Sequence, residues 1–107
     1  FRASTCTPFR IYNLKTEEYY SILVHSVAFS DWSLVKDTLS KQHTVDTIQS
    51  IANEVKKVNG EMIVLSHNDS YADSSKWKGW TSAYEYSARY LSALESNNLV
   101  EAGKFLL

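Results

Sequence analysis

The sequence predicts an all-α protein: an antiparallel up-and-down helical bundle of about four main helices plus a short C-terminal helical segment. Apolar residues recur at spacings of three and four through most of the chain after residue 15, as on the buried face of a helix. Polar turns separate these segments, and no two of them alternate like strands that could pair. The 107 residues are therefore expected to form one helical-bundle domain over 1–107, with 1–13 as an irregular N-terminal arm.

Two helices are expected in the first half of the chain. The segment from Thr16 to Phe29 begins with a good N-cap residue, followed by two glutamates where the helix dipole favours negative charge. Its apolar residues fall at positions i, i+3, i+4 and i+7 counted from Tyr20. Ser30 can cap a second helix with similar spacing, which ends near residues 41–43.

A third helix is expected after Thr44, with apolar residues on one side as far as Leu65. Gly60 interrupts this segment, so it is either one long helix or a helix of about four turns with a continuation. Residues 62–66, MIVLS, would also suit a short strand by composition. Because no partner strand is visible, the sequence favours a helix there.

The fourth helix is expected over about residues 74–96, after a polar loop over 67–75. The segment from Leu99 to Leu107 is rich in apolar residues, so it is expected to dock as a short helix over the aromatic stripe of the fourth helix. The expected core consists of large apolar residues: Trp32, Ile48, Ile51, Val55, Trp77, Trp80, Tyr84, Leu91 and Leu94.

Composition and charge exclude several classes of protein. A net charge of −1 gives no reason to expect a nucleic-acid partner, and no apolar run approaches the ~18 residues that a transmembrane helix needs. Cys6 is the single cysteine, so neither an intramolecular disulfide nor a cysteine-based metal cage can form. The chain begins with Phe1, which suggests a processed chain or an excised domain; we expect a periplasmic or secreted protein.

The sequence offers little evidence for catalysis. His25, His43 and His67 are far apart and lack the i, i+4 spacing of helical metal ligands, and the last two are expected to be solvated. The carboxylates lie near expected helix ends, where capping explains them, and neither a nucleophile motif nor a phosphate-binding loop is present. The expectation is therefore a protein that is not an enzyme, with no catalytic residues, no metal site and no evident cofactor.

Tyrosines are the best candidates for a binding surface. The chain has seven of them, and not all can share the expected core stripes. The residues expected to face outward or line a groove are Tyr19, Tyr20, Tyr86 and Tyr90. The leading interpretation is a non-catalytic helical module that binds a protein partner or a small apolar ligand, and a dimer is compatible with it.

The C-terminal third also resembles a known family of helical bundles. Trp77 and Trp80 open a long amphipathic segment that continues through Leu91, and the sequence NNLVEA follows at residues 97–102. This arrangement, together with the helical pattern around residues 31–37, is similar to the cytochrome c′ and cytochrome b562 type of four-helix bundle. The resemblance implies a periplasmic haem protein for electron transfer or small-gas binding.

The chain departs from that family at the haem-binding residues. The c-type members carry a C-x-x-C-H motif in the last helix, whereas Cys6 lies at the opposite end of this chain. Met62 is the only methionine, and the final segment holds no histidine to serve with it as an axial ligand. No ligand residue can be carried over, so the resemblance implies haem only if a haem-carrying segment lies outside this sequence.

Overall fold

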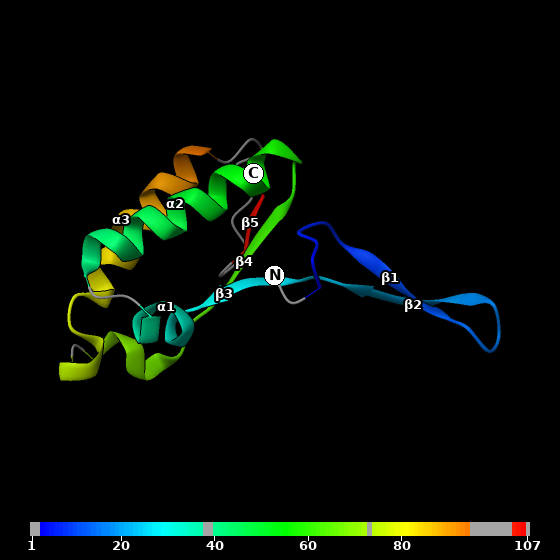
Figure 1. Ribbon diagram of the computed structural model, residues 1–107, viewed down its shortest axis with the longest axis horizontal. Helices are drawn as coiled ribbons and strands as arrows, with labels where there is room; N and C mark the ends of the chain where they lie inside the picture. The colour runs from blue at the N-terminus through cyan, green and yellow to red at the C-terminus, as the bar shows by residue number, and fades with distance from the viewer. Residues whose placement is uncertain (1–2, 38–39, 73, 95–103, 107) are drawn as a thin grey trace.

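The computed structural model describes residues 3–37, 40–72, 74–94 and 104–106 (Figure 1). Within these ranges the chain forms three α-helices, two short 3-10 helices and five strands, and the strands make two small sheets. The protein is therefore mixed α/β, and the prediction of an all-α up-and-down helical bundle is wrong. The error lies mainly in residues 9–30, where strands replace the expected arm and first helix.

The first sheet is a hairpin of β1 (Phe9–Asn13) and β2 (Glu18–Val24), which pair antiparallel. The β2 sequence, EYYSILV, is rich in aromatic and β-branched residues, which favour strands. So many of its residues are apolar that a helical spacing can be found among them by chance. In the turn, the Asn13 Oδ1 accepts hydrogen bonds from the backbone N–H groups of Lys15, at 2.9 Å, and Thr16, at 3.4 Å.

The second sheet has the strand order β3-β4-β5. β3 (Val27–Ser30) runs parallel to β4 (Glu61–Leu65), and β5 (Lys104–Leu106) runs antiparallel to β4. The strand that composition allowed at residues 62–66 is thus real, and its partner is β3, which the sequence analysis had placed in a helix. The expected C-terminal helix is a strand at residues 104–106, and the rest of that segment lies outside the described residues.

Three α-helices connect the strands: α1 (Asp31–Asp37), α2 (Lys41–Lys57) and α3 (Trp80–Leu94). The N-cap residue of α2 is Ser40, whose Oγ accepts a hydrogen bond from the His43 N–H at 3.2 Å. The 3-10 helices η1 (Asn68–Tyr71) and η2 (Ser75–Trp77) occupy the loop before α3. The long helices α2 and α3 lie side by side on one face of the β3-β4-β5 sheet (Figure 1).

The core lies between these two helices and the sheet. Most of the predicted core residues are buried, namely Ile48, Val55, Trp77, Trp80 and Leu91. Three more pack against them while partly exposed: Ile51, Tyr84 and Leu94. Trp32 is 48% exposed, which contradicts its predicted place in the core, and the sheet instead contributes Phe29, Met62 and Val64. Burying each such side chain contributes roughly 1.5–3 kcal/mol, so this layer accounts for much of the stability.

The N-terminal segment packs against the turn between α2 and β4. The Glu61 N–H donates a 2.7 Å hydrogen bond to the carbonyl oxygen of Cys6. A Cβ atom at Gly60 would lie 2.5 Å from the Cys6 Sγ, 3.0 Å from its carbonyl oxygen and 3.1 Å from a methyl group of Val55. Position 60 therefore needs glycine because two segments approach closely there.

We predict that Gly60→Ala lowers the free energy of unfolding by about 1–3 kcal/mol, because the new methyl group must displace the Cys6 segment. Urea denaturation at neutral pH measures the loss. In a Cys6→Ala background the nearest clash is absent, so the same Gly60→Ala substitution should cost less. Equal costs in the two backgrounds would show that the Sγ contact does not set the requirement for glycine.

Candidate active site

The candidate site lies at the carboxyl ends of the two parallel strands. Asp31 directly follows β3, and His67 lies two residues after the end of β4. Parallel strands end at the same edge of a sheet, so these two residues meet although they are 36 positions apart in sequence. This edge is where open α/β sheets usually bind their ligands.

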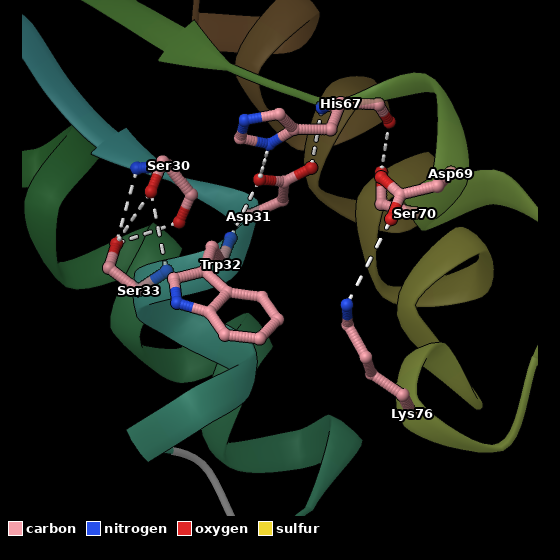
Figure 2. A network of polar contacts seen from close by, with 8 residues as sticks. All are labelled: Ser30, Asp31, Trp32, Ser33, His67, Asp69, Ser70 and Lys76. Carbon is pink, nitrogen blue, oxygen red and sulfur yellow. Dashed lines mark hydrogen bonds and ion pairs between the residues drawn. The ribbon is translucent and has the colours of Figure 1, made fainter.

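The carboxylate of Asp31 is fully buried and holds three short hydrogen bonds (Figure 2). Its Oδ2 accepts from the backbone N–H of His67 at 2.6 Å, and its Oδ1 accepts from the backbone N–H of Trp32 at 2.6 Å. The Nδ1 of the His67 ring lies 2.7 Å from the same Oδ1. Asp31 thus joins the end of β3 to the end of β4 and orients the imidazole.

The hydrogen bonds keep Asp31 ionised despite its burial. Burial by itself raises the pKa of a carboxyl group, because it disfavours the charged form. The backbone and ring N–H groups of His67, the Ser70 hydroxyl and the Trp32 N–H oppose that effect, and the net result is a pKa below the ordinary 3.8. Asp31 is therefore an anion at neutral pH.

The ionised state of Asp31 determines the tautomer of His67. A carboxylate only accepts hydrogen bonds, so the Nδ1 beside it must carry the proton. In the neutral ring the Nε2 then holds a free lone pair, and among the described residues it has no hydrogen-bond partner. The His67 side chain is 52% exposed, so a solvent molecule or ligand can reach the imidazole ring.

A hollow of about 260 Å³ adjoins the dyad of Asp31 and His67. The residues that line it are Ser30, Trp32, His67, Asp69, Lys76 and Trp77. The Lys76 Nζ lies 4.3 Å from the ring centroid of Trp32 and 4.9 Å from that of Trp77, within the range of cation–π attraction. The same Nζ is 3.9 Å from the Asp69 carboxylate, so Lys76 is held at the rim of the hollow.

Two further lysines line a second hollow, which shares Lys76 with the first. This second hollow is smaller, about 170 Å³, and Lys41 and Lys78 border it together with Lys76. Ser40, the N-cap of α2, lines the same hollow, so the positive end of the α2 dipole faces it. These groups make the surroundings of Lys76 attractive to anions.

The predicted binding tyrosines fall on two separate parts of the molecule. Tyr19 and Tyr20 lie on β2 and are 68% and 48% exposed, whereas the sequence placed them on a helix. Tyr86 is 53% exposed on α3. Tyr90 packs against the core, and its hydroxyl donates a 3.0 Å hydrogen bond to the Asn53 Oδ1. None of the four lines the hollow beside His67.

Neither member of the dyad was predicted from the sequence. His67 was expected to be solvated, and its side chain is indeed half exposed, but its ring is bound to Asp31. Of the other histidines, His25 places its Nδ1 2.6 Å from a carboxylate oxygen of Glu61. The signal that could have found the site was the position of polar residues directly after two parallel strands, had β3 been recognised as a strand.

Within the described ranges, no three His, Cys, Asp or Glu side chains gather as ligands for a metal ion. The α-helices of those ranges are also too short or too polar to cross a membrane. Comparisons of the chain with protein-family models, with curated proteins and with solved structures found no match. The geometry of the site therefore carries the functional argument.

We predict that Asp31→Asn lowers the free energy of unfolding by about 2–4 kcal/mol near neutral pH, because three N–H groups lose a charged acceptor. The pKa of Asp31 is depressed in the folded state, so its contribution is complete above pH 3.8 and is lost as the pH falls through the lower folded value. The difference between wild type and variant should therefore shrink only below about pH 4. Urea denaturation across the acid range measures it.

Asp46→Asn serves as the control, because Asp46 is an exposed carboxylate on α2. This exchange should change stability by no more than about 0.5 kcal/mol at any pH in the series. If Asp31→Asn behaves like Asp46→Asn, the buried carboxylate does not hold the two strand ends together.

Proposed function

We propose that this protein is an acid–base enzyme in which His67 is the general base and Asp31 orients it. The single observation that carries the proposal is the geometry of the dyad. A buried, ionised carboxylate lies 2.7 Å from the Nδ1 of a half-exposed imidazole, and that imidazole lines a hollow. The same pairing of a carboxylate with an imidazole prepares the base in hydrolases of unrelated folds.

Hydrolysis of an ester fits these groups. The Nε2 of His67 takes a proton from a water molecule as the water oxygen bonds to the carbonyl carbon of the substrate. The imidazolium that forms keeps its Nδ1–H on Asp31, whose negative charge stabilises it. When the tetrahedral intermediate collapses, the leaving oxygen departs with its bonding electrons and takes the proton from Nε2.

The surroundings of the dyad favour a substrate with a negatively charged group. Lys76 lines the hollow beside the dyad, and it also lines the second hollow together with Lys41 and Lys78. The half-exposed indole of Trp32 offers an apolar surface for the body of such a substrate. Asp69, beside Lys76, offsets part of the positive charge, so attraction depends on the three lysines together.

This proposal departs from the interpretation of the sequence as a non-catalytic module. That interpretation used the absence of a recognisable catalytic motif in one segment. Asp31 and His67 come from separate segments, so no local motif could reveal them. Binding of a protein partner concerns a different surface and is compatible with an enzyme.

We predict that the protein hydrolyses 4-nitrophenyl acetate and mono(4-nitrophenyl) succinate, with kcat/KM about tenfold higher for the anionic succinate, worth roughly 1.4 kcal/mol. His67→Gln should lower both values by about 100-fold, because general base catalysis typically contributes that much. Lys76→Met should lower only the value for the succinate. Release of 4-nitrophenolate, followed by absorbance, measures all of these rates.

His43→Gln is the matched control, because His43 is an exposed histidine on α2 with no place at the hollow. It should keep the wild-type rates for both esters. Equal rates in wild type and His67→Gln would contradict the role of His67. Equal preference for the succinate in wild type and Lys76→Met would contradict the role of the lysine while leaving the dyad in place.

A further inference from the structure

The hairpin of β1 and β2 projects from the rest of the protein, and no element of the described ranges covers either of its faces (Figure 1). Its large apolar side chains are about half exposed or more: Ile11 47%, Tyr12 43%, Leu14 85%, Tyr19 68%, Tyr20 48%, Ile22 62% and Leu23 48%. Solvent-exposed hydrophobic residues are common singly, but here they gather on both faces of one hairpin. The strand pairing puts Ile11, Tyr20 and Ile22 on one face and Tyr12, Tyr19 and Leu23 on the other.

The overall dimensions confirm how far the hairpin extends. The radius of gyration is 15.6 Å, against about 13 Å for a compact domain of this length, and the longest dimension is 51 Å. An isolated two-stranded hairpin is marginally stable in water. A hairpin this apolar therefore gains stability from a surface that covers it.

An apolar groove lies at the base of the hairpin. The groove has a volume of about 550 Å³ and runs along β3, the edge strand of the second sheet. Its lining is mostly apolar and consists of Ala3, Val24, Ser26, Val27, Ala28, Phe29, Ser30, Ser33 and Leu65. Val27 and Leu65 are 42% and 49% exposed, so the groove is open to solvent.

The positions of the hairpin and the groove allow two copies of the chain to cover each other's exposed apolar surfaces. The groove includes Val24, the last residue of β2, whereas the turn with Leu14 lies at the far end of the hairpin. If two identical hairpins lie side by side and antiparallel, the turn of each hairpin lies at the base of the other hairpin, because the two have the same length. A two-fold axis then places each Leu14 at the groove of the partner. Both copies use the same surface, so the dimer is closed and adds no third copy.

We infer that the protein forms a symmetric dimer in which each β1-β2 hairpin lies along the other and inserts Leu14 into the groove beside Val27 of the partner. The area supports a second copy as the occupant. One face of the hairpin, Leu14 and the exposed parts of Val27 and Leu65 in the groove present about 600 Å² in each copy, at the lower end of the ~600–1,000 Å² that each partner of a stable complex buries. The Asn13 turn also fixes the backbone at Leu14 before binding, which lowers the entropy cost.

A charge exchange tests this arrangement. Wild type at about 100 µM should sediment as a dimer, since a micromolar dissociation constant leaves little monomer there. Leu14→Glu and Val27→Lys should each raise the dissociation constant by about 100-fold or more. Each substitution places a charge in both of the symmetry-related apolar contacts between turn and groove. An equimolar mixture of the two variants should sediment as a dimer again.

The mixture is the decisive sample. In the mixed dimer, the Leu14→Glu turn meets the Val27→Lys groove, so opposite charges pair, while the other half keeps its native residues. Tyr86→Glu is the control, because it places an acid at an exposed apolar side chain on α3, outside the hairpin and the groove. It should leave the dimer unchanged, and circular dichroism should show all variants folded. If Val27→Lys fails to fold, Ala3→Lys replaces it in the same groove.

Three results would overturn the proposal: a wild type that is monomeric at that concentration, a Leu14→Glu variant that remains dimeric, or a mixture that stays monomeric. The first would leave the hairpin as a surface for a different protein. The second would place the dimer contact elsewhere on the molecule. The third would show that the turn and the groove do not meet.

Discussion

The parallel pairing of β3 with β4 is the constraint on which most of this structure depends. It requires a crossover connection, and α1 and α2 supply one that also covers a face of the sheet. It places Met62 and Val64 under the helices, where they join the core. It also brings the ends of both strands to one edge. The buried carboxylate of Asp31, the tautomer of His67 and the position of the hollow all follow from that edge.

The sequence predicted the helical part of the fold much better than the strands. The segments of α2 and α3 were recognised, because their apolar residues repeat over 17 and 15 residues and no strand pattern competes with such lengths. The strands are only three to seven residues long. In β2 five of the seven residues are apolar, so its sequence fits a helical period as well as an extended one. Length, more than composition, determined which elements could be found.

The candidate site was harder to predict than the fold, for a related reason. A strand needs a partner, and β4 was rejected because its partner β3 had been assigned to a helix. The wrong assignment of β3 therefore also led to the rejection of β4. The sheet edge at which Asp31 and His67 meet could then not be predicted. The tyrosines were easier, since exposure of Tyr19, Tyr20 and Tyr86 follows from an excess of aromatic residues over core positions. Their division between a hairpin and a helix required the structure.

The separation of Asp31 and His67 along the chain also bears on how the protein folds. Their contact closes a loop of 36 residues, and the entropy cost of that closure must be met before the β3-β4 hydrogen bonds stabilise it. Helix α2 lies inside this loop and can form from local contacts alone. We therefore expect the carboxylate to become buried, and the imidazole to become oriented, only at a late stage of folding. During synthesis His67 would remain an ordinary mobile side chain until the long loop has closed.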